Sequence, residues 1–504
     1  MKAFLLHPRK DYELEAQLPP GHEALVQDLG LDTLFEAMAA GDSYVLGVAR
    51  AVVLGGLRDP DEMVYRQRVL MDCVEHAPVI RQLYELAVAA IEGERRGWRI
   101  YTGDPGLALS GSVRSLEQLM SPLRQLRRLA DDQGQTFESD GFNNFFATLR
   151  AELNDAYLLE LDEHLRLLRF GSGVSINGRL GKRNAGTGFV LLRPSRWTWR
   201  RLLPGGERGG HTIAISRGDD AGFQALADLQ ARGINLVANA VGQAVDHILS
   251  FFAMVRFETG FYLACLNLRE RLLEIGEPVC FPEPRDRGED VLTARGLYDV
   301  GLSLRMSGRA IGNDLDADGR SLVMITGANQ GGKSTFLRCV GIAQVMMQCG
   351  LFVGAEQFRA DVRDRVFTHF KRREDPTMTS GKLDEELKRF SDIADDLTRN
   401  SLLLFNESFA ATNEREGADI AEEIVRALLE AGDKVLFVTH SYELARRFLG
   451  QGRADILFLR AERLTDGRRT FRQLEGEPLP TSYGKDLFRG IFASDSSAGG
   501  LGPS

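Results

Sequence analysis

The residues best suited to chemistry form a glycine-rich run in the C-terminal part of the chain. The stretch Gly327–Ser334 fits the pattern G-x-x-x-x-G-K-[ST], with an apolar strand-like segment before it and a helix-like segment after it. In such a phosphate loop (Walker A motif) the backbone N–H groups point at one anion, Lys333 reaches the outer phosphates, and the Ser334 hydroxyl binds Mg²⁺. The alternative is an ordinary glycine turn, which the flanking strand and helix patterns disfavour. The residues predicted to hold ATP are Gly327, Ala328, Asn329, Gln330, Gly331, Gly332, Lys333, Ser334 and Thr335.

A second apolar segment ends in two residues that can act on a bound phosphate. Leu402–Phe405 is followed by Asn406 and Glu407. A carboxylate at that position can orient or activate water, so Glu407 is the candidate general base. Asn406 stands where an aspartate usually helps to hold Mg²⁺, and an amide supplies an oxygen without a charge. Slow hydrolysis, or ATP binding with little hydrolysis, is therefore an open alternative.

A third apolar segment, Val435–Val438, ends at Thr439 and His440. If the segments are neighbouring parallel strands, the imidazole lies at the same sheet edge, where it can sense a γ-phosphate. A lone histidine is more often structural, so this assignment depends on the other two motifs. Lys333, Glu407 and His440 are the predicted catalytic residues, and Ser334 and Asn406 are the predicted metal ligands.

The elements that must position these residues follow from hydrophobic periodicity. In the C-terminal part, apolar strand-like runs alternate with helical ones, which predicts an α/β domain with a mostly parallel sheet. Helical spacing dominates 31–100 and 115–168, and 219–275 is long enough for two long helices. Pro278, Pro282 and Pro284 then mark a domain boundary.

Between these helical stretches, residues 171–217 are glycine-rich and alternating, which predicts a small β-rich insertion. Cations gather there with Trp197 and Trp199 among them. Such interleaving can follow a phosphate backbone and stack on bases, although a run of charge is more often a solvated face. The candidate DNA contacts are Arg183, Arg196, Arg200 and Arg201.

Composition restricts the class of protein only broadly. A chain of 504 residues with 43% hydrophobic residues should fold into several units. The net charge of -9 argues against a uniformly basic nucleic-acid coat. The five cysteines show no zinc spacing, and we find neither a signal peptide nor an uncharged apolar stretch long enough to span a bilayer. We therefore expect a cytoplasmic protein with no membrane partner.

Taken together, the C-terminal motifs resemble the ATPase domain of the MutS family of DNA mismatch-repair proteins, a branch of the ABC-type ATPases. The likeness covers about residues 310–487 and is most specific at Ile325–Thr335. The segment Ile311–Asp314 is similar to the family's I-P-N-D, which implies that Ile311 packs beside the adenine. Other matching segments are Ser380-Gly381-Lys382, Asn406-Glu407 with Thr412 and Gly417, Thr439-His440 and Ser482-Tyr483-Gly484.

The resemblance implies a multidomain fold with an α-helical core and lever region followed by a P-loop ATPase domain. The expected division is a helical core over 1–114, a lever region with the basic insertion over 115–290, the ATPase domain over 291–490 and a disordered tail over 491–504. It also implies a homodimer that sandwiches two nucleotides, in which Ser380, Gly381 and Lys382 of one subunit face the phosphates on the other. Mismatched or branched DNA and a downstream repair protein are the expected partners.

Three departures from the family pattern bear on function. Asn406 replaces an aspartate, and the acidic run Leu383–Glu386 replaces a serine-threonine signature. We also expect the mismatch-reading and connector domains to be absent, because Phe-x-Glu occurs only at Phe281 and Phe405, in unsuitable settings. The sequence therefore favours a dimeric ATP-dependent clamp on DNA, with a nucleotide-gated protein-interaction switch that does not contact DNA as the rival.

Overall fold

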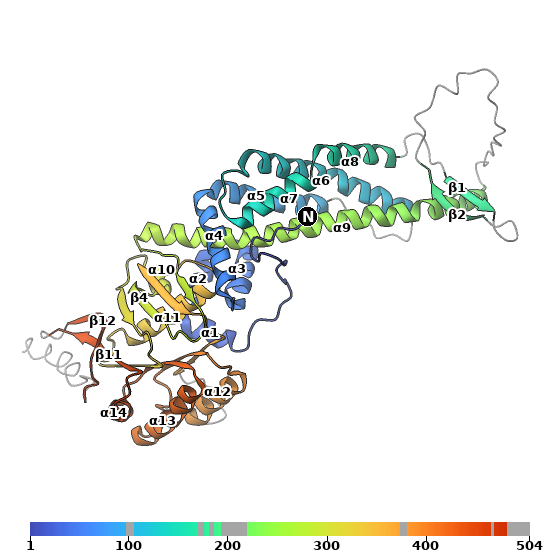
Figure 1. Cartoon of the computed structure of the whole chain (residues 1–504). Helices are drawn as coiled ribbons and strands as arrows, with labels where there is room; N and C mark the ends of the chain where they lie inside the picture. Colours follow the sequence, from blue (N-terminus) through green and yellow to red (C-terminus); the bar gives the residue numbers. More distant parts are fainter. Residues whose placement is uncertain are drawn as a thin grey trace, which may run out of the picture. The chain divides into compact units, whose positions relative to one another are not determined.

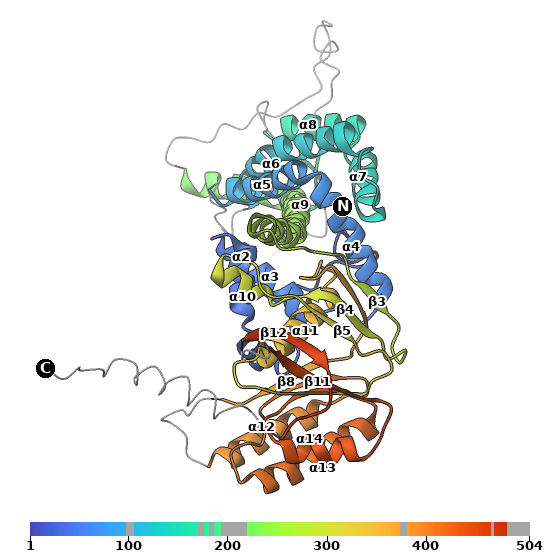
Figure 2. The same ribbon diagram turned by 90° about the vertical axis from the view of Figure 1, so that its left-hand side faces the viewer.

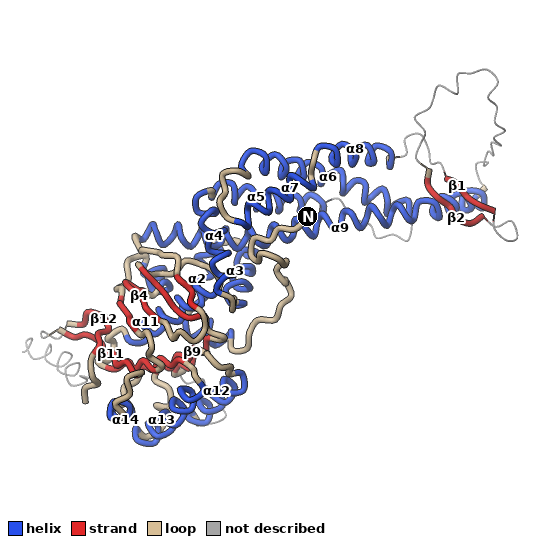
Figure 3. Tube along the Cα trace, viewed as in Figure 1, coloured by secondary structure: helices blue, strands red, loops and turns tan. Residues whose placement is uncertain are grey.

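The computed structural model describes residues 1–96, 105–169, 176–180, 186–192, 219–372, 381–464 and 468–480 (Figure 1). These residues form two compact units, and each unit is built from two separate stretches of the chain. Unit 1 comprises Met1–Tyr12 and His76–Thr259, and unit 2 comprises Glu13–Glu75 and the chain from Gly260 onward. Helices make up most of unit 1, whereas the larger sheets belong to unit 2 (Figure 3).

The first helices of unit 1 confirm the predicted helical periodicity. Polar side chains fix two of their starts: Ser139 Oγ accepts a hydrogen bond from Phe142 N, and Asn154 Oδ1 accepts one from Tyr157 N. The phenylalanines that follow Ser139 are fully buried and form part of the core. The helices are α5 (Ala77–Arg96), α6 (Pro105–Gln133), α7 (Asp140–Glu152) and α8 (Asp155–Leu168).

One helix, α9, occupies Asp220–Ile275, where we expected two. The expectation was wrong because nothing in these 56 residues stops a helix: there is no proline, and the cost of each internal glycine, about 1 kcal/mol relative to alanine, is offset by packing. In unit 1 the α9 residue Phe251 stacks on Phe145 of α7, and Arg256 lies over the ring of Tyr84 of α5. Residues of α9 up to Thr259 belong to unit 1 and the remainder to unit 2.

Part of α9 has the length and composition of a membrane-spanning helix. Within Ala231–Ile275, one 18-residue window has a mean hydropathy of 1.4 and contains no more than two charged residues. Of that window, 72% is buried inside the protein. Buried core helices of soluble proteins share this composition, so the finding is weak evidence for a membrane.

The predicted β-rich insertion contains an antiparallel hairpin. Its strands are β1 (Ile176–Leu180) and β2 (Gly186–Leu191), which pair from Ile176 with Leu191 to Leu180 with Gly186. The candidate DNA contacts Arg183, Arg196, Arg200 and Arg201 lie outside the described residues.

Unit 2 is organised around a six-stranded sheet in the order β12-β11-β6-β10-β9-β8. The five strands from β11 to β8 run parallel, and only β12 is antiparallel to its neighbour. The three predicted strands are confirmed as β6, β9 and β10, and they are buried along nearly their whole length. The strands are β6 (Leu322–Thr326), β8 (Val366–Phe370), β9 (Leu402–Asn406), β10 (Lys434–Val438), β11 (Ile456–Arg463) and β12 (Arg469–Glu475).

Helices cover both faces of this sheet. Figure 2 shows α12 (Lys382–Asp396), α13 (Glu414–Ala431) and α14 (Tyr442–Gly450) together on one face. Their apolar sides join the strands in one core that includes Phe405, Val425 and Phe437. The helix α11 (Lys333–Gln348) follows β6 directly and is buried along most of its length.

A smaller four-stranded sheet and the N-terminal helices complete unit 2. The strand order is β3-β7-β4-β5. In α4, the buried Arg66 donates to Cys349 O at 3.2 Å and Gln67 donates to Pro282 O at 3.0 Å, so these residues are structural links. The strands are β3 (Glu283–Arg285), β4 (Leu292–Leu297), β5 (Asn313–Asp316) and β7 (Gln357–Asp361). The helices are α1 (His22–Leu29), α2 (Leu31–Ala39), α3 (Ser43–Gly55), α4 (Pro60–Glu75) and α10 (Val300–Met306).

Candidate functional site

The glycine-rich run connects β6 to α11 at the carboxyl edge of the parallel strands. Gly327 has φ 113° and Gly332 has φ 85°, values that side chains rarely allow. A Cβ atom on Gly332 would also lie 3.2 Å from the carbonyl oxygen of Phe471 on β12. The loop therefore bends tightly enough to place the N-terminus of α11, with its unpaired N–H groups, at the rim of a cavity.

Lys333 is buried at the first position of α11, with 4% of its surface exposed. Its Nζ donates to Gly327 O at 3.1 Å and to Ala328 O at 2.9 Å. Burial lowers the pKa of Lys333 to about 8, and the nearby Glu407 carboxylate partly opposes this shift. The ammonium group thus lies folded onto the loop with incomplete charge compensation, which suits it to an anionic ligand.

The next residue, Ser334, lies opposite the end of β9. Its Oγ donates to Asn406 Oδ1 at 2.8 Å, so a hydroxyl and an amide oxygen lie side by side. Both are ligand types that Mg²⁺ accepts alongside phosphate oxygens and water. Among the described residues, no group of three or more His, Cys, Asp or Glu side chains is placed to hold a metal by itself.

Glu407 and His440 meet because β9 and β10 are neighbouring parallel strands. The strand register pairs Asn406 with Val438, and Glu407 N donates to Val438 O at 2.9 Å. Two residues beyond the end of β10, His440 Nε2 lies 2.7 Å from Glu407 Oε1. The hydrogen bond from His440 lowers the pKa of Glu407, which keeps the side chain an ionised acceptor.

One cavity of about 710 Å³ within unit 2 is bordered by the loop from Asn329 to Thr335 and by Glu407 and His440. The predicted site residues Gly327, Ala328 and Asn406 do not line it. Lys333, Ser334, Glu407 and His440 are among its polar lining residues, and Ile311, with 48% of its surface exposed, is among its apolar ones. A cavity of this size, lined by both apolar and polar residues, fits a nucleotide-sized ligand. The remaining apolar lining consists of Leu302, Met306, Phe336, Cys339 and Phe471.

Sequence reasoning missed the contribution of β12 to this cavity. Gln473 N donates to Asn313 Oδ1 at 2.7 Å, and Gln473 Nε2 donates to Gly331 O at 3.0 Å. Strand β12 thereby ties the Ile311 segment to the glycine loop, and it also contributes Phe471. No local spacing reveals these contacts, because they join residues more than 140 positions apart.

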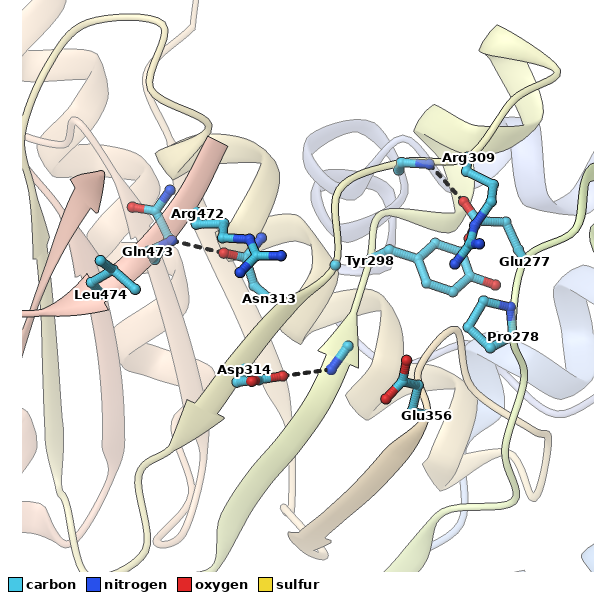
Figure 4. A pocket seen from close by; sticks show the side chains of 13 residues that line it. Glu277, Pro278, Tyr298, Arg309, Asn313, Asp314, Glu356, Arg472, Gln473 and Leu474 are labelled. Carbon is cyan, nitrogen blue, oxygen red and sulfur yellow. Dashed lines mark hydrogen bonds and ion pairs between the residues drawn. The ribbon is translucent and has the colours of Figure 1, made fainter. Parts of the chain in front are cut away.

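A second cavity, of about 370 Å³, shares Arg309, Ala310 and Asn313 with the first (Figure 4). Glu277 is buried there and accepts hydrogen bonds from Ser303 Oγ at 2.6 Å and Ala310 N at 2.7 Å. Figure 4 shows the Tyr298 ring directed toward Glu277 and Arg309. The Tyr298 hydroxyl is buried and makes no hydrogen bond within the described part of the chain. Glu277 thus holds the backbone of the segment that carries Ile311.

The other predicted site residues are not brought to the 710 Å³ cavity. Gly381 directly precedes α12 and Lys382 is its first residue. Both are exposed, and neither lines that cavity. Ser380 lies outside the described residues. In the acidic run, Asp384 pairs with Lys388, whereas Glu386 is buried and accepts a hydrogen bond from Phe409 N at 2.8 Å.

The fold and the cavity define a multidomain protein, in which a helical unit is joined to a unit built on a parallel α/β sheet. Two family models match the chain: the MutS2 N-terminal domain over residues 58–275 and MutS domain V over residues 323–491. The chain belongs to the MutS family.

Curated relatives agree with this membership. A DNA mismatch repair protein MutS from Thermus aquaticus is 32% identical over 225 residues, which is 45% of this chain and 27% of the relative. The same-named protein from Syntrophomonas wolfei is 31% identical over 193 residues, 38% of this chain and 22% of the relative. That from Thermotoga petrophila is 38% identical over 141 residues, 28% of this chain and 18% of the relative. The matched part thus spans about a quarter or less of these relatives' length.

Proposed function

We propose that this chain is an ATPase whose nucleotide site is the 710 Å³ cavity of unit 2. The observation that carries the proposal is the convergence of Lys333, Ser334, Glu407 and His440 on that one cavity, with Asn406 hydrogen-bonded to Ser334. The loop Gly327–Ser334 then acts as the P-loop of an ABC-type ATPase domain. Membership of a family whose relatives are named for DNA mismatch repair supports a role in DNA repair or recombination.

Each residue has a distinct role in this proposal. The loop N–H groups and Lys333 bind the β- and γ-phosphates, and Ile311 packs against the base. Ser334 and Asn406 would hold Mg²⁺, which offsets phosphate charge when bound. Glu407 orients the attacking water and accepts its proton, and His440 holds the Glu407 carboxylate in place. Hydrolysis is slow, because the Asn406 amide contributes no charge at the metal.

We further propose that the protein acts as a cytoplasmic homodimer that closes on mismatched or branched DNA when ATP binds. Gly381 and Lys382, exposed at the start of α12, then face the nucleotide of the other subunit. The basic residues Arg183, Arg196, Arg200 and Arg201 contact the DNA backbone, and ATP acts by shifting the dimer between two states.

The test is ATP turnover by the purified protein, alone and with mismatched, branched or plain duplex DNA. We expect turnover to rise with DNA and to be lost in Glu407→Gln, which keeps the side-chain size and removes the base. Lys382→Glu should inhibit turnover, and mixing it with native protein tests whether the residue acts across a dimer. Replacing Arg196, Arg200 and Arg201 by Glu should abolish DNA stimulation while leaving basal turnover intact.

The rival function is a nucleotide-gated protein-interaction switch, which the uncharged Asn406 favours. Tight ATP binding with turnover indifferent to every DNA would support that rival. A protein partner that is retained after nuclease treatment, and only in the presence of ATP, would identify what the switch controls.

A further inference from the structure

The segment that carries Glu407 has an unfavourable backbone conformation. Glu407 has φ 55° and Phe409 has φ 61°, and neither is a glycine. Side chains disfavour this left-handed region, so the surrounding contacts must hold the segment in place. The position of the Glu407 carboxylate therefore depends on whatever holds Ser408 and Phe409.

Two buried residues outside the nucleotide cavity make those contacts. Phe409 N donates to Glu386 Oε2 of α12 at 2.8 Å. Ser408 Oγ lies 2.7 Å from Nδ1 of His369 on β8 and 2.5 Å from the carbonyl oxygen of the same histidine. The His369 ring also stacks on Phe409, with centroids 5.1 Å apart and planes 17° apart.

The His369 ring connects these contacts to α12. Its Nε2 lies 3.0 Å from the carbonyl oxygen of Glu386, which can only accept, so Nε2 must carry the proton. Burial lowers the pKa of His369 to about 4, so the ring is neutral near pH 7. Its unprotonated Nδ1 faces the Ser408 hydroxyl, whose single proton is shared between Nδ1 and the carbonyl oxygen of His369. Glu386, His369 and the Glu407–Phe409 segment thus form one closed hydrogen-bonded network.

We propose that Glu386 and His369 are positioning residues that set the orientation of Glu407 and couple it to α12. The helix begins at Lys382, directly after Gly381, and Glu386 lies one turn later on the same rigid element. If the start of α12 engages a second subunit's nucleotide and moves, that displacement is thereby transmitted to the Glu407 carboxylate. This inference rests on the proposed ATPase function.

The test compares Glu386→Ala with Glu386→Gln, which retains an acceptor oxygen for Phe409 N. We expect Glu386→Ala to lower kcat about tenfold or more with little change in ATP affinity, because only the base is displaced. Glu386→Gln should retain most of the turnover. His369→Phe, which preserves ring stacking and loses both hydrogen bonds, should lower kcat in the same way. Asp392→Ala, at an exposed position on the same helix, is the matched control.

Hydrogen exchange of peptides covering 402–413 provides a readout that does not need turnover. Exchange should increase in Glu386→Ala and stay native-like in Glu386→Gln and Asp392→Ala. Native kcat in Glu386→Ala, or exchange unchanged from that of the native protein, would overturn the inference. The ATPase proposal is contradicted by a different result: the native protein does not hydrolyse ATP, or its hydrolysis is unchanged in Glu407→Gln. In that case the exchange experiment still decides whether Glu386 holds the segment.

Discussion

At the scale of single residues, the site combines an ionised carboxylate with a lysine that is partly deprived of solvent. His440 lowers the pKa of Glu407, whereas burial lowers the pKa of Lys333 to about 8. The two groups respond to pH in different ranges. Near pH 8 the charge of Lys333 changes, whereas Glu407 stays ionised.

The lysine predicts a pH dependence of ATP binding. Above its pKa of about 8 the free site loses the ammonium charge, and ATP must recruit a proton to restore it. The dissociation constant should therefore rise as pH increases from 7.5 to 9.5, by about tenfold per pH unit at the upper end. Calorimetric titration of Glu407→Gln with Mg-ATP measures this. When Lys333→Arg is added, the dissociation constant should no longer change with pH in this range. If it still changes as before, a group other than Lys333 takes up the proton.

The buried hydroxyl of Tyr298 predicts a stabilising substitution. It makes no hydrogen bond within the described residues, and burial raises the pKa of the phenol. Tyr298→Phe keeps the ring and removes a group whose burial costs about 1–3 kcal/mol when it is unpaired. Urea denaturation should show an increased free energy of unfolding. A decrease would mean that the hydroxyl is paired in solution, by water or by a ligand of the cavity in Figure 4.

At the scale of elements, the C-terminal end of α11 is constrained by the helix packed against it. Gly350 has φ 77°, and a Cβ atom there would lie 2.5 Å from Cβ of Arg66 on α4. Gly432 ends α13 with φ 86° and has open space around it. The two glycines therefore share the backbone requirement and differ in packing.

This pair separates backbone strain from packing. Gly432→Ala should destabilise by about 1–2 kcal/mol through the left-handed conformation alone. Gly350→Ala should cost about 1–3 kcal/mol more, because α4 and α11 must move apart. Denaturant unfolding of both variants measures the difference. Equal losses would show that α4 accommodates the extra methyl group without cost.

The elements also show what the sequence could and could not predict. Strands β6, β9 and β10 were predictable because each is a short and mainly apolar run. The polar residues at or just after the ends of β9 and β10, such as Asn406 and His440, indicated the edge that carries the candidate site. Strand β12 was not predictable, because its pattern is mixed and its role depends on contacts of Gln473 with Asn313 and Gly331. The single α9 was missed because the two-helix expectation rested on the length of residues 219–275, and length does not show whether one helix or two fill such a span.

At the scale of the whole molecule, α9 is divided between the two compact units, with its residues up to Thr259 in unit 1 and the rest in unit 2. At 1.5 Å per residue its 56 residues extend about 84 Å. Multidomain chains of this kind need not unfold in one transition. The proposed nucleotide cavity belongs entirely to unit 2, so a ligand there acts directly on that unit's stability.

Calorimetry of Glu407→Gln should accordingly show two thermal transitions, of which Mg-ATP raises only one. At a ligand concentration of 100 times Kd the stabilisation is about 2.7 kcal/mol, enough to shift that transition by several degrees. Hydrogen exchange near the transition temperatures assigns each transition to its unit. A single transition that ATP moves as a whole would show that α9 joins both cores into one cooperative block.

Unit 2 is built from two stretches of chain that are far apart in the sequence, so the ribosome makes its two parts at different times. Helices α1 to α4 leave the ribosome early, yet partners such as Cys349, to which Arg66 donates, are translated nearly 300 residues later. At about 5–20 residues per second, this delay is on the order of 15–60 s. During that time the faces of these helices that pack on later elements, such as β8, α10 and α11, have no native partner. Nascent chains of this protein should therefore depend on chaperones that shield an N-terminal segment.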